Sequence, residues 1–127
     1  MTRINVVPVE SLHRKHLVAE YKEITRPFGK VRKRIAKGQS PRNVKIPHEY
    51  TLGTGHETFF FDKLGYLAKR YQQLTQEILR RGYNANPVSI TDLTNGIDNK
   101  WMNDYIPTSD AIQINTQRIL ERMPKED

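Results

Sequence analysis

The chain has 127 residues, no cysteine and a formal net charge of +7. This length fits one domain with a modest core, and its balance of 36% apolar to 28% charged residues is typical of a folded soluble protein. The lack of cysteine excludes disulfide frameworks and thiolate metal sites. No apolar run approaches the roughly 20 residues of a membrane span, and the N-terminus lacks the apolar segment of a signal peptide. We therefore expect one cytoplasmic domain spanning residues 1–127, without a membrane partner.

Positive charge is concentrated in residues 14–45. This window holds eleven Lys and Arg residues and only two acids, Glu20 and Glu23, so it carries +9 while the remainder of the chain carries about −2. Such a local excess is the electrostatic signature of a nucleic-acid-binding surface. A solubilising helix face is the alternative interpretation. A membrane-surface helix is disfavoured, because the apolar side chains of this region form a stripe of core-facing width.

The first predicted helix covers residues 11–37. Its apolar residues recur at alternating steps of four and three, and they define one buried face that consists of Leu17, Tyr21, Ile24, Phe28, Val31 and Ile35. Ser11 is expected to cap this helix. Pro27 should kink or split it, because a proline there removes a backbone hydrogen bond to Glu23. Glu20 and Glu23 are expected to lie away from the buried face, among the cations.

Two further helices are predicted. Asp62 should cap a helix over residues 62–82, with Gly82 as its stop and a buried face formed by Leu64, Leu67, Tyr71, Leu74 and Ile78. Thr108 should cap a third helix that continues to about Met123. Strand-like sequence is limited to residues 58–61. The sequence therefore predicts an all-α fold of three helices joined by long irregular loops.

Four side chains of the first helix form a candidate site. His13, His16, Glu20 and Glu23 recur at steps of three, four and three, so they share one helical face. One interpretation is a zinc or iron site, although the other helices lack the matching ligands of a di-metal bundle. A second is a set of surface ion pairs with neighbouring cations. A third makes Glu23 a catalytic carboxylate beside cations that bind phosphate.

Thr2 supplies a nucleophile for the third interpretation. A small second residue predicts removal of Met1, which leaves Thr2 as the mature N-terminus. An α-amine has an ordinary pKa of about 7.7–8.0, and nearby cations such as Arg3, Lys22 and Arg26 are expected to lower the pKa of this one. A neutral amine can attack the C1′ atom of a sugar and form an imine, a reaction more often performed by lysine. Threonine after methionine is common, so the pattern alone does not identify an enzyme.

Longer motifs are spread over nearly the whole chain. They are Met1-Thr-Arg-Ile-Asn5, His16-Leu-x-Ala-Glu-Tyr-x-Glu23, Phe28-Gly-x-Val-Arg-Lys33, Leu52-Gly-x-Gly-His-x-Thr-Phe-Phe-x-Asp-Lys-Leu64 and Asp104-Tyr-Ile-Pro107. Together they resemble the pyrimidine-dimer DNA glycosylases of the bacteriophage endonuclease V type. The resemblance implies a three-helix fold with an extended N-terminal segment packed between the helices. It also implies a monomeric glycosylase and abasic-site lyase that needs no cofactor and acts on double-stranded DNA containing UV photoproducts, in a bacterial or phage-infected cell.

The resemblance also implies residue roles. The α-amine of Thr2 would attack C1′ of the 5′ nucleotide of the dimer to form a Schiff base, and Glu23 would stabilise the developing sugar cation and assist strand cleavage. His16 and Glu20 are candidates for supporting these groups, with a structural ion pair as the alternative for Glu20, and no metal ligand is implied. The adenine opposite the lesion would be flipped out of the duplex. The phosphates of the kinked DNA would be held by Arg3, Lys22, Arg26, Arg32, Arg118 and Arg122.

Two departures from the family pattern stand out. Lys22 occupies a position where the best-known relatives carry arginine, so the charge is kept without bidentate phosphate geometry. The printed sequence also ends soon after the third helix, without a tyrosine-rich tail, which is expected to affect lesion specificity more than chemistry. Two rival functions follow from the same residues: a non-catalytic DNA-binding or architectural protein, and a metal-dependent nuclease.

Overall fold

Residues 2–124, the part of the chain that the computed structural model describes, contain five α-helices and four short 3-10 helices. The α-helices are α1 (Arg14–Glu23), α2 (Arg26–Ala36), α3 (Leu64–Arg80), α4 (Ile90–Leu93) and α5 (Ser109–Glu121), and the 3-10 helices are Val9–Ser11, Pro41–Asn43, Thr58–Phe60 and Asn99–Trp101. Extended pairing within residues 2–124 is limited to one isolated bridge between Lys63 and Met102. The all-α prediction is therefore confirmed. No helix in this part of the chain is long and apolar enough to cross a membrane.

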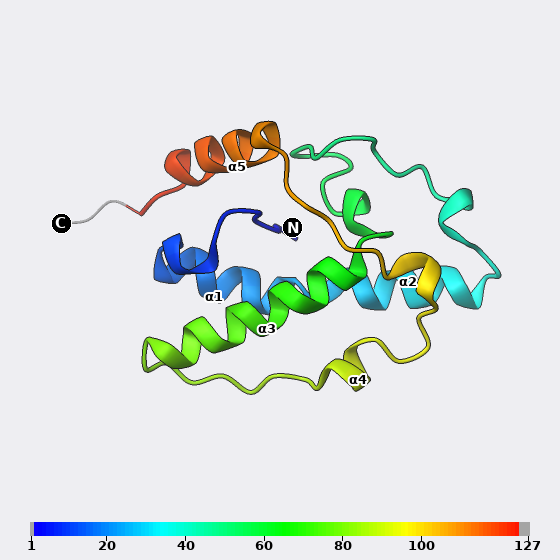
Figure 1. Ribbon diagram of the computed structural model, residues 1–127, viewed down its shortest axis with the longest axis horizontal. Helices are drawn as coiled ribbons and strands as arrows, with labels where there is room; N and C mark the ends of the chain where they lie inside the picture. Colours follow the sequence, from blue (N-terminus) through cyan, green and yellow to red (C-terminus); the bar gives the residue numbers. More distant parts are fainter. Residues whose placement is uncertain (1, 125–127) are drawn as a thin grey trace.

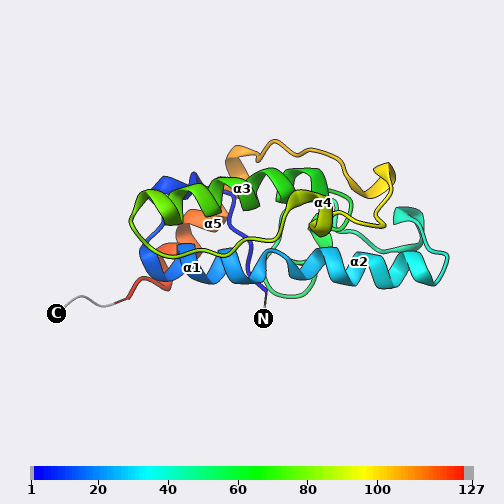
Figure 2. The same cartoon turned by 90° about the horizontal axis from the view of Figure 1, so that it is seen from below.

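Pro27 splits the first predicted helix in two, as expected. The helix α1 ends at Glu23 and α2 begins at Arg26, with Pro27 in its first turn, where a missing backbone N–H costs nothing. The two helices follow each other along the long axis of the molecule (Figure 2). The split leaves Glu23 as the last residue of α1, at the joint between them.

The core lies between the α1–α2 rod and α3, which runs back alongside it (Figure 1). Both predicted buried faces are confirmed, because Leu17, Ile24, Phe28 and Val31 from the rod and Leu64, Leu67 and Leu74 from α3 are all fully buried. Burial of each such side chain contributes about 1.5–3 kcal/mol. Tyr21 and Ile35 of the predicted face are only partly buried, and the Tyr21 ring stacks on Tyr71 with 5.4 Å between the ring centroids.

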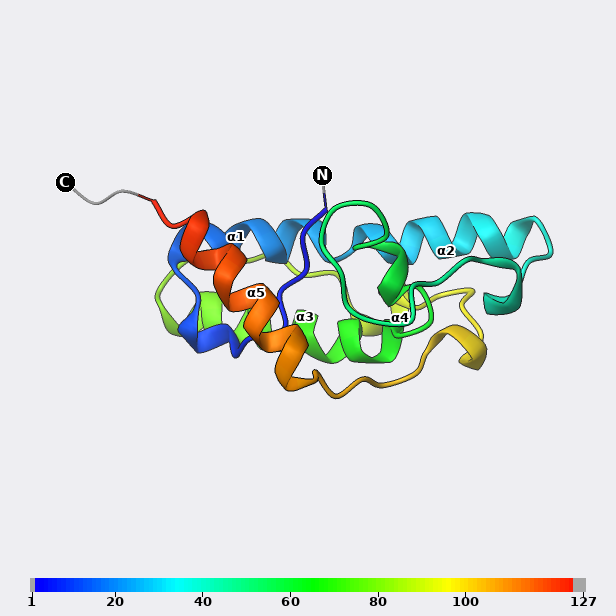
Figure 3. The ribbon, with the colours of Figure 1, turned by 90° about the horizontal axis from the view of Figure 1, so that it is seen from above.

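The N-terminal segment, residues 2–8, crosses this helical layer. Figure 3 shows it with α5 on one side and the loop that precedes α3 on the other. Its apolar residues Ile4, Val6 and Val7 are buried. The expectation of an extended N-terminal segment packed between the helices is therefore met, and α5 closes over a segment more than 100 residues away in sequence.

Three local predictions were wrong. Ser11 does not cap α1, because it belongs to the preceding 3-10 turn; the His13 side chain instead accepts a hydrogen bond from the Lys15 N–H at 3.1 Å. Asp62 does not cap α3, which begins after Lys63 without a side-chain cap, and the Asp62 carboxylate pairs with the Lys63 amine. The strand-like residues 58–61 form a 3-10 turn, since three consecutive phenylalanines are all buried by turning into the core.

Candidate active site

Glu23 lies directly against the start of the chain. Its Oε1 atom accepts a hydrogen bond from the main-chain N–H of Arg3 at 2.8 Å, across 20 residues of sequence. Because the nitrogen of Thr2 is separated from that of Arg3 by only two backbone atoms, this bond holds residue 2 beside the carboxylate. Thr2 is buried, and its hydroxyl oxygen accepts a hydrogen bond of 3.4 Å from the guanidinium of Arg26. Met1, whose removal the sequence predicts, lies outside the described residues.

The next residue of the segment is fixed by a buried histidine. The Ile4 N–H donates to Nε2 of His56 at 2.9 Å, while Nδ1 of His56 lies 2.8 Å from the carbonyl oxygen of Thr51. These partners require a neutral imidazole that carries its proton on Nδ1. The carbonyl oxygen of Ile4 accepts a bond from the Tyr50 hydroxyl at 3.3 Å. The loop that precedes α3 thus binds both main-chain polar groups of Ile4.

The neutral state of His56 predicts a stability loss in mild acid. Burial lowers the pKa of His56, so the unfolded chain takes up a proton at a higher pH than the folded protein does. The contribution is fully present above the unfolded pKa of about 6.5 and is lost as pH falls through the folded pKa, with a slope of at most about 1.4 kcal/mol per pH unit. Denaturant unfolding from pH 8 to pH 5 should show a smaller acid loss for His56→Gln than for the unchanged protein. Equal slopes would contradict this assignment.

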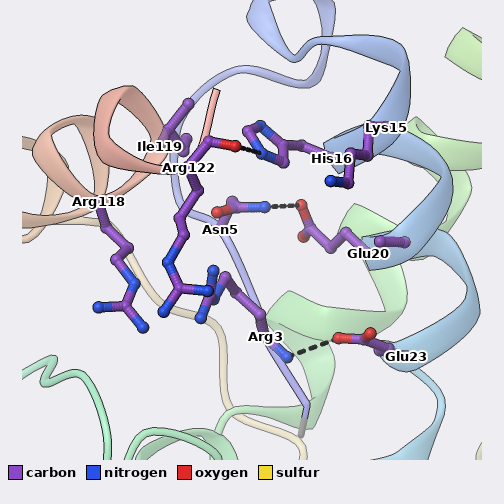
Figure 4. Close-up of a pocket in the computed structure, with 10 residues that line it drawn as sticks. Arg3, Asn5, Lys15, His16, Glu20, Glu23, Arg118, Ile119 and Arg122 are labelled. Carbon is purple, nitrogen blue, oxygen red and sulfur yellow. Dashed lines mark hydrogen bonds between the residues drawn. The ribbon is translucent and has the colours of Figure 1, made fainter. Parts of the chain in front are cut away.

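A cavity of about 450 Å³ opens beside Glu23, between α1, α5 and the N-terminal segment. Figure 4 shows the side chains of Arg3, Arg118 and Arg122 gathered on one side of it and Glu23 on the other. Burial lowers the pKa of Arg3, and the charges of Arg118 and Arg122 lower it further, whereas Glu23 acts in the opposite direction. Three guanidinium groups thus converge where one free carboxylate is present, which favours an anionic ligand.

Two polar atoms of the cavity wall are buried without a hydrogen-bond partner within residues 2–124. They are Nε of Arg118 and Nδ1 of His16. The other ring nitrogen of His16 lies 3.2 Å from the carbonyl oxygen of Arg122 and ties α1 to the end of α5 (Figure 4). Burial lowers the pKa of His16, which favours the neutral ring. Unpaired buried polar atoms are costly, and both of these belong to side chains that line the cavity.

Glu20 does not lie among the exposed cations, contrary to expectation. It is 1% exposed, and both of its oxygens are bound by the guanidinium of Arg70 from α3. Because a buried carboxylate needs a charged partner, this pair explains one of the two acids of the basic helix. Of the two acids in the basic region, Glu23 is the one that forms no salt bridge within residues 2–124.

The remaining predicted DNA contacts divide into two groups. Lys22 and Arg26 line a second hollow that Glu23 also lines, so they lie close to Glu23. Arg32 lies elsewhere: its guanidinium donates to the carbonyl oxygen of Leu93 at 2.7 Å and holds α2 against α4. The Arg32 guanidinium therefore has a structural contact of its own, away from the cavity beside Glu23.

The candidate metal ligands have separate tasks. His13 caps α1, His16 contacts the end of α5, Glu20 is neutralised by Arg70, and Glu23 accepts the Arg3 N–H. Across residues 2–124, no group of three or more histidine and acidic side chains is arranged to hold a metal ion.

Sequence reasoning missed four residues that shape the site: Asn5, His56, Arg70 and Asn115. Arg70 and Asn115 carried a helical-periodicity signal, because Arg70 is three residues from Leu67 and four from Leu74, and Asn115 is four from Ala111. Polar residues at positions of a buried helical face indicate an internal contact. Asn5 interrupts an apolar run in the same way. Nothing local marks His56, whose partner is 52 residues away.

An all-α fold that gathers guanidinium groups from both ends of the chain around one carboxylate is suited to an anionic polymer such as a nucleic acid. The family model for pyrimidine dimer DNA glycosylases matches residues 1–91, more than half of the chain. The chain therefore belongs to the pyrimidine dimer DNA glycosylase family, and it is a DNA repair enzyme. The match includes Glu23, the N-terminal segment and α1–α3, whereas α5 lies beyond it.

Proposed function

We propose that this protein is a combined glycosylase and abasic-site lyase that excises UV-induced pyrimidine dimers through the α-amine of Thr2. The observation that carries the proposal is the hydrogen bond between the Arg3 N–H and Glu23, which keeps residue 2 within reach of a carboxylate in a cationic cavity. Its prerequisite is removal of Met1, so that the amine is free. The substrate is double-stranded DNA containing a cyclobutane dimer, and the protein acts as a monomer without a cofactor.

In the first step, the neutral amine attacks C1′ of the 5′ nucleotide of the dimer. A bond forms between the amine nitrogen and C1′, the glycosidic bond breaks, and the pyrimidine leaves with the bonding electrons and takes up a proton. Glu23 stabilises the positive charge that develops on the sugar, which is a role for a fixed charge in a partly buried site. Opening of the sugar ring then gives a protonated imine between Thr2 and C1′.

In the second step, a proton leaves C2′ with the assistance of Glu23. The electrons form a C2′–C3′ double bond and expel the 3′ oxygen with its phosphate, so the strand breaks by β-elimination. Water hydrolyses the imine, which releases an unsaturated aldehyde on the DNA and restores the amine. Amine and carboxylate thus complete the sequence, and no external oxidant or reductant is consumed.

The cations around the site supply the DNA contacts. Arg3, Arg118 and Arg122 converge on the cavity beside Glu23, and Lys22 and Arg26 line a second hollow that also includes Glu23. A guanidinium group can bind a phosphate through two parallel hydrogen bonds, and three of them line this cavity. These groups would hold the DNA backbone on both sides of the reacting sugar, with a strong dependence of affinity on salt.

Nicking of irradiated plasmid in EDTA tests the proposal against both rivals. Protein with Met1 removed should convert UV-irradiated supercoiled plasmid to the nicked form and leave unirradiated plasmid intact. The DNA-binding and architectural rival predicts salt-dependent binding without nicking, and the nuclease rival predicts inhibition by EDTA. Nicking that depends on added metal ions would contradict the amine mechanism.

A further inference from the structure

Four buried polar side chains form a continuous chain of hydrogen bonds from α3 to α5. Arg70 binds Glu20, whose Oε1 accepts a bond of 2.9 Å from the Asn5 amide. The Asn5 oxygen accepts a bond of 2.8 Å from the Asn115 amide. All four residues are at most 4% exposed. These hydrogen bonds pass through Asn5 of the N-terminal segment, so they link α1, α3 and α5 to that segment.

The hydrogen bonds can run in one direction only. Glu20 is held by Arg70 and can only accept, so Asn5 must turn its NH₂ group toward Glu20 and its oxygen toward Asn115. Asn115 must then turn its own oxygen away, where it accepts the main-chain N–H of Val6 at 2.7 Å and that of Val7 at 3.3 Å. Those N–H groups can only donate. All of these hydrogen bonds are therefore formed in one orientation of the two side-chain amides and in no other.

Within residues 2–124 the N-terminal segment pairs with no strand, so other groups must bind its main-chain N–H groups. The main-chain N–H groups of Arg3, Ile4, Val6 and Val7 are all bound by side chains, from α1, the loop before α3, and α5. Apolar packing gives little register, because residues 6 and 7 are both valine and a slip by one residue exchanges one apolar side chain for another. Asn5 is the polar residue within the buried run of residues 4–7. A single buried asparagine is a well-established way to fix register.

We propose that Asn5 and Asn115 are positioning residues, which fix the register of the N-terminal segment and thereby hold the Thr2 amine at the reacting sugar. The inference rests on the proposed amine chemistry. The Thr2 amine is connected to the rest of the protein on one side only, so its position depends on the hydrogen bonds that hold residues 3–7. A slip of one residue displaces the amine by about 3.3 Å, and a misplacement of about 1 Å can already lower a rate about 100-fold.

Asn5→Asp tests whether the donor–acceptor direction of these hydrogen bonds matters, with almost no change in the shape of the side chain. It places a carboxylate against Glu20, so we expect the rate of imine formation, trapped by borohydride under single-turnover conditions, to fall about 100-fold. Affinity for dimer-containing DNA should fall much less than the rate, since Arg3 is the one proposed phosphate contact on the segment that shifts, and the other proposed contacts lie on α1, α2 and α5. The matched control is Asn84→Asp, which makes the same charge change at an exposed position after α3. This control should react at the rate of the unchanged enzyme.

A second substitution should restore the rate. In Asn5→Asp combined with Glu20→Gln, the new glutamine amide can donate to the new aspartate, and the carboxylate and carboxamide have exchanged places with no change in total charge. We expect most of the lost rate to return. If thermal melting shows that Asn5→Asp is unfolded, Asn115→Asp takes its place, because it keeps the acceptor for Val6 and Val7 and loses only the donor to Asn5.

The outcomes are separable. An unchanged enzyme that forms no trapped adduct would overturn the proposed imine chemistry and this inference with it. A trapped unchanged enzyme together with a folded Asn5→Asp variant of equal rate would overturn the inference alone. So would a double variant that folds and binds DNA but stays as slow as Asn5→Asp, because register would then not depend on the direction of the hydrogen bonds.

Discussion

Replacement of Glu23 by glutamine is expected to abolish strand cleavage at pyrimidine dimers while DNA binding is retained. Glutamine keeps a side-chain oxygen that can accept the Arg3 N–H, so the start of the chain stays in place. It removes the negative charge that stabilises the sugar cation and the base that assists loss of the C2′ proton. Removal of either function typically costs about 10²–10³-fold or more, so a fall of at least about 10³-fold is expected.

The measurement for Glu23→Gln is single-turnover cleavage of a duplex with one defined dimer, together with its binding affinity. Glu10→Gln is the matched control, because it removes one negative charge from an exposed side chain in the 3-10 turn before α1. The control should cleave normally. If Glu23→Gln retained more than about a tenth of the normal rate, the catalytic role would have to move to another group.

Insertion of one glycine between Met1 and Thr2 is expected to reduce imine formation by at least about 100-fold. Glycine is small enough for Met1 still to be removed, so the protein keeps a free α-amine of ordinary reactivity. Residues 3–7 remain held by Glu23, His56 and Asn115, so the added residue must extend beyond them. The amine then lies up to about 3.6 Å from its original position.

Thr2→Ser is the control for the insertion. It keeps the chain length, the free amine and a hydroxyl for Arg26, and it should react within a few-fold of the unchanged enzyme because the main-chain nitrogen, not the side chain, is the nucleophile. Removal of Met1 is checked in every variant by intact mass. An inserted variant with undiminished activity would mean that the position of the terminal amine is unimportant, and a lysine would then have to supply the nucleophile.

The helices were predictable because their apolar periodicity is strong. Leu17, Phe28, Leu67 and Leu74 are buried as their spacing requires. Pro27 identified the split because its ring cannot continue the backbone ladder. The helix starts were less predictable, since capping depends on neighbours: a 3-10 turn occupies Ser11, so the cap of α1 falls on His13.

The site was predictable only in part. Glu23 and Thr2 could be paired from chemistry and family resemblance, but their proximity depends on contacts across 20 residues of sequence. Glu20 shows why surface charge alone misleads: it is three residues after Leu17 and four before Ile24, on the buried face, and it requires a cation that α3 supplies. Asn115 contacts the N-terminal segment across more than 100 residues, a distance over which no local pattern gives guidance.

The central claim is that the α-amine of Thr2 forms the covalent intermediate. Borohydride reduction during reaction with dimer-containing duplex, followed by proteolysis and mass spectrometry, tests it most directly. The result expected is one protein–DNA adduct, located on the N-terminal peptide with Thr2 as its first residue. An adduct on a lysine-containing internal peptide, or no adduct with an enzyme that still cleaves the strand, would contradict it.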